Sequence, residues 1–144
     1  MATYTRRHAT ESEMEPIFEG YRRTVGEYVA MAWGWDESFQ RDGFWMHHPL
    51  NEFEIIEVDS EFAGGLHVVE DEVDLYIRMI FLLPKFQNRG IGSALIEDIQ
   101  ATARKREKGL CLKVINCNPA ASLYERLGFR VIDESNSSKD MRWD

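Results

Sequence analysis

The stretch LLPKFQNRGIGSAL, Leu82 to Leu95, constrains this chain more than any other. An apolar run ends at Pro84, which lacks a backbone donor and cannot continue the interior of a sheet. Gly90 and Gly92 follow, and an apolar stripe at i, i+4 spacing then predicts a helix from Ile91 to Lys105. The pattern therefore predicts a strand, a glycine turn and a helix in direct succession.

A glycine turn before a helix can bind phosphate in three ways. The P-loop pattern G-x-x-x-x-G-K-[ST] does not occur in the sequence. The dinucleotide pattern G-x-G-x-x-G/A fails at Leu95, and the next predicted strand, LCLKVI, ends without the acid that would hold a ribose. In the third way, the glycines permit close backbone approach, and the first amides of the helix carry the positive end of its dipole. The turn is thus either an anion site of pyrophosphate size, with Arg89 and Lys85 at its rim, or a plain connection.

The residue pattern of the N-terminal third predicts one strand followed by two helices. TYTRRHA alternates weakly, as a first strand would. Thr10 and Glu13 fit a capping box, and the helix after them is expected to run from Glu11 to about Ala32. A second, shorter helix is expected to start near Asp36.

The rest of the chain is mostly strand. The predicted strands are FEIIEV, FAGGLHVVE, VDLYIRMIFLL, LCLKVI, and a closing hairpin of FRVIDE and KDMRWD. NPAASLYERLG predicts a short helix, with Asn118 as its N-cap and Gly128 in the left-handed position after its end. The element order predicts an α/β (α+β) fold with helices on both faces of the sheet.

Composition narrows the class of protein. Of the 144 residues 44% are hydrophobic and 12% aromatic, enough for a core, and we expect a single domain over residues 1–144. The formal net charge of −8 argues against a nucleic-acid partner; it is compatible with a cationic amine, or with solubility alone. No apolar run reaches the length needed to span a bilayer, and because no apolar stretch follows the basic residues near the start, we expect no secretory signal. We expect a cytoplasmic protein without membrane contact or metal, in which Cys111 and Cys117 stay reduced.

Two motifs carry a resemblance to a known family. QNRGIG, Gln87 to Gly92, resembles the Q/R-x-x-G-x-G/A signature of the GNAT acyltransferases. NPAASLYERLGF, Asn118 to Phe129, resembles the second signature of that family, a helix that ends in L-G-F. The motifs occur in the order of the family, and the resemblance extends from about Phe53 to the C-terminus. It implies a mixed, mostly antiparallel central sheet in which two parallel strands, IRMIFLL and LCLKVI, splay apart.

The resemblance implies that acetyl-CoA is the cosubstrate and lies between those two strands. Its pantetheine arm would pair with the backbone of Leu82, and the amide of Ile80 would point at the thioester carbonyl as an oxyanion donor. The amides of Gln87 to Ser93 would bind the pyrophosphate. The implied cofactor-binding residues are Leu82, Leu83, Gln87, Asn88, Arg89, Gly90, Ile91, Gly92, Ser93, Asn118 and Ala121.

The second motif would supply the general acid. By resemblance, Tyr124 protonates or stabilises the coenzyme A thiolate as it leaves; the alternative is a tyrosine packed on the apolar face of its helix. Asn118 either caps that helix or contacts the pantetheine amide. Because this chain has the shorter form N-P-A-x-x-L-Y, we favour capping.

The usual place of the general base holds a different residue here. Family members often carry a glutamate one residue before the oxyanion donor, where this chain has Met79, preceded by Arg78. The candidates elsewhere are Asp74, His67, Glu52 and Glu54. The unperturbed pKa of a histidine, about 6.5, would suit His67, although a histidine inside a strand is more often structural. His47 and His48 either line the acceptor site or lie in a solvated loop.

Aromatic residues crowd the N-terminal third. They could form a cage for a cationic acceptor, but such rings more often form a core or a dimer interface. The rings are those of Tyr21, Tyr28, Trp33, Trp35, Phe39, Phe44 and Trp45.

Two functions remain. One is an N-acetyltransferase that moves an acetyl group from acetyl-CoA to a primary amine of a small molecule or peptide, by direct attack in a ternary complex. The other is a non-catalytic acyl-CoA-binding sensor or partner module, which Arg78 and Met79 favour slightly, whereas Tyr124 favours catalysis. The residues select neither the acceptor, nor the donor chain length, nor the oligomeric state, for which a homodimer is one option.

Overall fold

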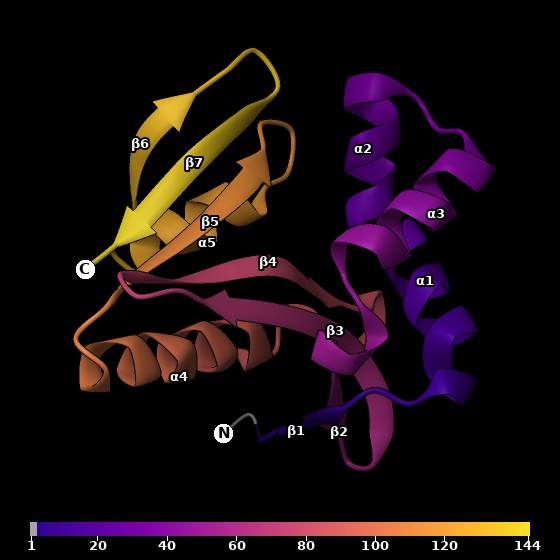
Figure 1. Cartoon of the computed structure of the whole chain (residues 1–144), viewed down its shortest axis with the longest axis horizontal. Coiled ribbons are helices and arrows are strands. Elements are labelled where there is room, and N and C mark those ends of the chain that lie inside the picture. Colours follow the sequence, from indigo (N-terminus) through magenta and orange to yellow (C-terminus); the bar gives the residue numbers. More distant parts are fainter. Residues whose placement is uncertain (1–2) are drawn as a thin grey trace.

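The computed structural model describes residues 3–144 and contains a seven-stranded sheet in the order β1-β2-β3-β4-β5-β7-β6 (Figure 1). Every neighbouring pair is antiparallel except β4 and β5, which are parallel. This confirms the mixed, mostly antiparallel sheet. The strands are β1 (Thr5–His8), β2 (Glu54–Val58), β3 (Glu61–Glu70), β4 (Asp74–Leu82), β5 (Gly109–Ile115), β6 (Arg130–Glu134) and β7 (Ser138–Trp143).

Helices cover both faces of the sheet. The α-helices are α1 (Met14–Arg22), α2 (Val25–Trp33), α3 (Glu37–His47), α4 (Ile91–Lys105) and α5 (Ala120–Arg126). Short 3-10 turns are η1 (Glu11–Glu13), η2 (Leu50–Glu52) and η3 (Pro84–Phe86). Within residues 3–144 no helix is both long and apolar enough to cross a bilayer.

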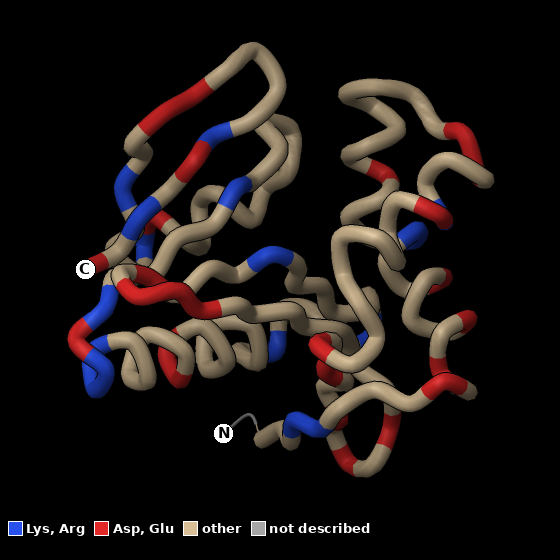
Figure 2. The backbone as a smooth tube through the Cα atoms, viewed as in Figure 1, with Lys and Arg blue, Asp and Glu red and all other residues tan. Residues whose placement is uncertain are grey.

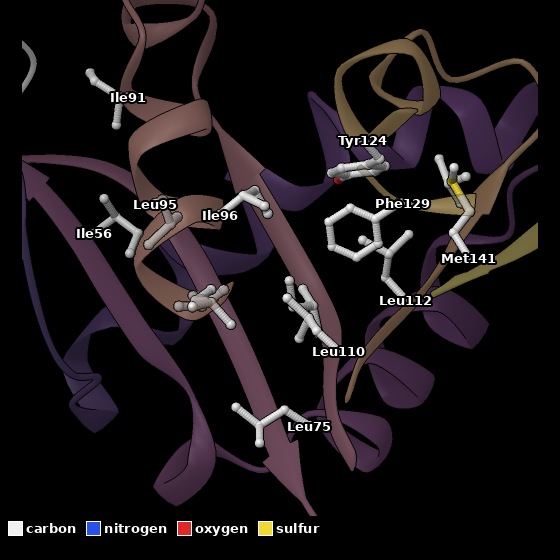
Figure 3. Packing of buried hydrophobic residues seen from close by; sticks show 14 of the residues in the cluster. Ile56, Leu75, Ile91, Leu95, Ile96, Leu110, Leu112, Tyr124, Phe129 and Met141 are labelled. Carbon is white, nitrogen blue, oxygen red and sulfur yellow. The ribbon is translucent and has the colours of Figure 1, made fainter. Parts of the chain in front are cut away.

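A hydrophobic cluster lies on each face of the sheet. The larger joins the apolar stripe of α4 to β4, β5 and α5, and Figure 3 places Tyr124 and Phe129 at one end of it. The smaller joins α1 and α3 to Phe53, Ile55 and Phe81 on the opposite face. Strand β4 contributes to both, since alternate side chains point to opposite faces. It is therefore the central element of the fold.

The expected single helix from Glu11 to Ala32 is wrong. It is divided into η1, α1 and α2, with the break at Arg23 and Thr24. The Thr24 hydroxyl donates to the carbonyl of Gly20 at 2.7 Å, and its backbone leaves the helical region at φ −121° and ψ −95°. Threonine competes for backbone acceptors in this way, which the apolar spacing cannot reveal. The N-terminal capping box of Thr10 and Glu13 is present as expected.

The parallel strands pair over only part of their length. Pairs run from Asp74 opposite Gly109 to Ile77 opposite Leu112, and then stop. At the same point the register of β4 with β3 slips, because His67 faces Met79 whereas Val68 faces Ile77. The slip leaves Arg78 as an extra, bulged residue. A bulge bends its strand, so β4 turns away from β5, and the expected splay is confirmed.

Candidate active site

A cavity of about 640 Å³ opens where β4 parts from β5. Its walls come from the α1–α2 junction, the end of β4, the glycine turn and the start of α5. The sequence-predicted residues that line it are Ile80, Leu82, Gln87, Asn88, Gly90, Gly92, Ser93, Asn118 and Tyr124. Both sequence motifs therefore meet around one space.

Four other predicted residues do not line the cavity. Ile91 and Ala121 are buried in the larger cluster, and Leu83 packs between the two clusters. The Arg89 guanidinium lies 5.6 Å from the ring centroid of Phe86. Ile91, Ala121 and Leu83 therefore belong to the packing behind the cavity, whereas Arg89 is exposed.

The backbone of β4 directs groups into the gap that neither neighbouring strand pairs. Leu83 donates its N–H to the carbonyl of Ala63 at 2.8 Å. In an antiparallel ladder, residues that bond to the partner alternate with residues whose N–H and C=O point to the other side. Ile80 and Leu82 are therefore the residues that direct their backbone groups toward β5, where the sheet has opened.

The glycine turn presents a row of free amides. Asn88 and Gly90 both have left-handed backbones, with φ of 60° and 80°, and the first bond of α4 runs from Ala94 N to Gly90 O at 3.1 Å. Among residues 3–144, no acceptor is found for the amides from Asn88 to Ser93. Such a concave row, at the positive end of a helix dipole, suits an anion.

Gln87 departs from the expectation for this turn. Its backbone N–H is already used, donating to the carbonyl of Pro84 at 3.2 Å. Its side-chain amide donates to the carbonyl of Leu82 at 2.8 Å, which ties the turn to the end of β4. Gln87 therefore braces the turn, and the amides that the fold leaves free run from Asn88 to Ser93.

The positive charge expected at the rim is reduced. The Lys85 ammonium pairs with Glu61 at 2.7 Å, so its charge is partly neutralised. Arg89, over Phe86, has no carboxylate partner within the described residues. Charge at the turn thus comes mainly from the helix dipole and Arg89.

Tyr124 belongs both to the larger hydrophobic cluster and to the lining of the cavity. Its ring is buried beside Phe129, with the centroids 5.8 Å apart, and it also lines the cavity. Burial raises the pKa of Tyr124 to about 12. No hydrogen-bond partner for its hydroxyl lies among residues 3–144. The phenol therefore keeps its proton at neutral pH and can donate it into the cavity.

Helix α5 holds Tyr124 in place through its two ends. The Asn118 side chain accepts a hydrogen bond from the amide of Ala120 at 2.9 Å, so the expected capping contact is present. At the other end Gly128 has φ of 98°, and Phe129 N donates to Tyr124 O at 3.0 Å. This is a Schellman motif, which fixes the tyrosine backbone.

The structure separates the candidate bases. Asp74 lies at the start of β4, ion-paired with Arg142 at 2.8 Å, and Glu54 pairs with Arg6 at 2.9 Å on the β1–β2 edge. Neither lines the cavity. Met79 packs its side chain in the smaller cluster.

His67 and Glu52 lie instead in a buried hydrogen-bonded chain. His67 Nε2 is 2.9 Å from Glu52 Oε1, and His67 Nδ1 is 2.8 Å from His48 Nδ1. Both imidazoles are buried, whereas Glu52 is half exposed. Burial, together with the charges of His67, Arg78 and His47, lowers the pKa of His48 to about 3. His48 is thus a neutral, interior group, and the solvated-loop alternative is wrong for it.

A second cavity, of about 240 Å³, lies beside this chain. It is lined by Met46, His47, Pro49, Glu52, His67, Val69 and Arg78. Arg78 is the only basic residue of β4, visible as the blue segment in that strand (Figure 2). The strand therefore borders the second cavity at Arg78 and the first at Ile80.

Most of the N-terminal rings form core. Tyr21 and Phe44 are buried with centroids 4.7 Å apart, and Trp35 lies 6.1 Å from Tyr21. Trp33 and Phe39 are exposed. For the buried rings, the packing matches the core alternative and not the cage.

Sequence reasoning missed one wall of the first cavity. Arg23, Thr24, Val25, Glu27 and Tyr28 line it from the α1–α2 junction. Tyr28 O also accepts a weak contact from Cys117 Sγ at 3.8 Å, which joins α2 to the loop after β5. Only the helix break between α1 and α2 could have indicated this wall.

Comparison with known proteins agrees with this arrangement. The model of the acetyltransferase (GNAT) domain matches residues 40–131, more than half of the chain. The peptidyl-lysine N-acetyltransferase YiaC of Escherichia coli (strain K12) is 32% identical over 78 residues, 54% of this chain and 49% of that protein. The chain thus spans about half the length of the curated relative that it matches.

Solved structures share the whole fold. The PaiA N-acetyltransferase of Thermoplasma acidophilum, in complex with coenzyme A, has a TM-score of 0.76 at 19% identity, over 97% of this chain and 98% of that one. The ribosomal-protein-S18-alanine N-acetyltransferase of Escherichia coli has a TM-score of 0.71 at 19% identity, over 97% and 92%. With the motifs and the splayed strands in place, the domain match shows that the chain belongs to the GNAT acetyltransferase family.

Proposed function

We propose that this protein transfers an acetyl group from acetyl-CoA to a primary amine by direct attack in a ternary complex. The observation that carries the proposal is one cavity lined by three chemically matched parts. These are the backbone of Ile80 and Leu82, the free amides of the glycine turn, and the hydroxyl of Tyr124.

Acetyl-CoA would be held mainly by backbone groups. Its pyrophosphate would accept hydrogen bonds from the amides of Asn88 to Ser93, and its extended pantetheine would pair with Leu82 as an added strand does. Asn118, Leu83, Arg89, Ile91 and Ala121 would position these groups. Named structural neighbours support this ligand, since PaiA was solved with coenzyme A bound.

The chemistry follows from where charge develops. The amine nitrogen forms a bond to the thioester carbon, and the carbonyl oxygen becomes negative beside the amide of Ile80, which stabilises it. The C–S bond then breaks, Tyr124 protonates the departing thiolate, and the nitrogen loses one proton to a base. Because the pKa of Tyr124 is raised to about 12, its hydroxyl would still carry the proton when the thiolate leaves.

The acceptor is a primary amine in this proposal. The names of relatives support that class: YiaC is called a peptidyl-lysine acetyltransferase, and the S18-alanine enzyme an N-acetyltransferase of a ribosomal protein. The same names support acetyl as the transferred group.

The test is thiol release with Tyr124→Phe. We expect kcat to fall about 100-fold, the low end of the effect of a general acid, with acetyl-CoA affinity unchanged in calorimetry. Tyr76→Phe is the matched control, because Tyr76 lies in β4 outside the cavity and should leave kcat unchanged.

Three other outcomes would contradict parts of the proposal. Equal kcat for Tyr124→Phe and wild type would remove the acid role. Acetyl-CoA binding by wild type without thiol release, on any primary amine, would favour the non-catalytic sensor. A wild type that does not bind acetyl-CoA would overturn the proposed function as a whole.

A further inference from the structure

The second cavity contains two opposite charges that do not neutralise each other. Arg78 and Glu52 both line it, yet no ion pair joins them, and Arg78 has no carboxylate partner anywhere in residues 3–144. The protein has a net charge of −8, so acids are plentiful, and an arginine that lines a cavity without one is available to an anionic ligand. Of the eleven other arginines of the described chain, seven have a carboxylate partner: Arg6, Arg7, Arg22, Arg41, Arg106, Arg130 and Arg142. The other four, Arg23, Arg89, Arg104 and Arg126, have none, but they do not line the second cavity.

The backbone explains why Arg78 stands where it does. It is the bulged residue of β4, at the point where pairing with β5 has just ended. A bulge re-aims a side chain and often borders a functional site. Arg78 precedes the proposed oxyanion donor, Ile80, by only two residues, so neighbouring parts of one strand line the two cavities.

The acidic residue of this cavity is braced by hydrogen bonds. Glu52 is held by His67, which is itself fixed by His48 in the interior. His67 is also the cross-strand partner of Met79, the position where the family often has its base. Side chains of such a pair lie on one face of the sheet. Glu52 is therefore the exposed carboxylate of a braced chain, on the same side as the missing base.

We propose that this cavity binds the zwitterionic head of an amino acid acceptor, with the carboxylate on Arg78 and the amino group on the Glu52 side. The inference rests on the proposed function and names its substrate class. A planar guanidinium binds a carboxylate through two parallel hydrogen bonds, and a carboxylate attracts an ammonium and can take its proton. At about 240 Å³ the cavity has room for such a head, since a water molecule occupies roughly 30 Å³.

The test uses matched amines that differ in one charge. Thiol release is measured with α-, β- and γ-amino acids and with the amide of each, and with a peptide whose only amine is an internal lysine. We expect wild type to favour the acids over their amides by about 10-fold or more in kcat/KM.

Two variants assign the charges. Arg78→Gln should lower kcat/KM about 10- to 100-fold for the acids and leave the amides unchanged. Glu52→Gln should lower it for both. Arg104→Gln, a basic residue of α4 that stacks on Trp143 and lines neither cavity, should change nothing. Acetyl-CoA affinity, measured by calorimetry, should be the same in all three.

The outcomes separate this inference from the proposed function. Equal rates for acids and amides, a preference for the peptide lysine, or an Arg78→Gln variant that weakens both series equally would each overturn the zwitterion site while leaving the acetyltransferase intact. If acetyl-CoA binds but no amino acid is acetylated, the inference also fails. If acetyl-CoA does not bind, the proposed function fails first.

Discussion

Replacing Gly92 by alanine should change stability and ligand binding in opposite directions. Gly92 is in the first turn of α4, and a Cβ there would meet Leu123 Cδ2 and Leu82 Cδ1 at 3.7 Å, an ordinary contact. The fold therefore accepts the methyl. Alanine is favoured over glycine in a helix, so we expect a gain of about 0.5 kcal/mol in the free energy of unfolding.

The same methyl points toward two residues that line the cavity, in the proposed path of the pyrophosphate. Displacing an anion from charged hydrogen bonds costs about 1.5–3 kcal/mol, which weakens acetyl-CoA binding about 10- to 100-fold. Thermal unfolding should show a rise of about 1–4 °C, while calorimetry shows the loss of affinity.

Two further glycines serve as comparisons. Gly43 lies inside α3, and a Cβ added to it would have no other atom within 4 Å, so Gly43→Ala should raise stability by about 1 kcal/mol and leave binding unchanged. Gly90 has φ of 80°, so Gly90→Ala should lower stability by about 1–2 kcal/mol. If Gly92→Ala keeps full affinity for acetyl-CoA, the pyrophosphate does not lie on this turn.

Two other predictions concern titration and charge burial. His48 has a folded pKa of about 3, against about 6.5 unfolded, so the unfolded state alone takes up its proton and stability falls as pH drops from 6.5. Urea unfolding should show a loss of about 1.4 kcal/mol per pH unit that His48→Gln lacks; parallel slopes would refute this. Arg142→Gln leaves the buried Asp74 unpaired and should cost about 2 kcal/mol. The exposed Arg130→Gln should cost under about 1 kcal/mol, and equal losses would contradict the burial argument.

The parts of the fold that local rules decide were predictable from the sequence. Helix α4 begins and ends where its apolar stripe and glycines place it, and Gly128 takes the left-handed conformation expected after α5. These features depend on a few neighbouring residues. The break at Thr24 was not predictable, because a side-chain hydroxyl competes there with a helix whose apolar spacing continues.

The candidate site also has one part that was predictable from the sequence and one part that was not. The glycine turn is one continuous segment, and the cavity contains most of the residues that the two motifs indicated. The Glu52–His67–His48 chain was out of reach, because α3, η2 and β3 must first pack before residues 15 and 19 positions apart can touch. The bulge at Arg78 likewise depends on the register between β4 and β3, which the sequence of β4 alone does not determine.

The parting of β4 from β5 gives the sheet two edges in its interior, besides those at its rim. Only four residue pairs between β4 and β5, from Asp74 to Ile77, connect the two halves of the described sheet. Unpaired edges are templates for foreign strands and openings for proteases. A ligand that lies in the gap as a temporary strand closes them and stabilises the folded state by mass action. The lifetime of the protein in the cell would then increase with the concentration of its own cosubstrate.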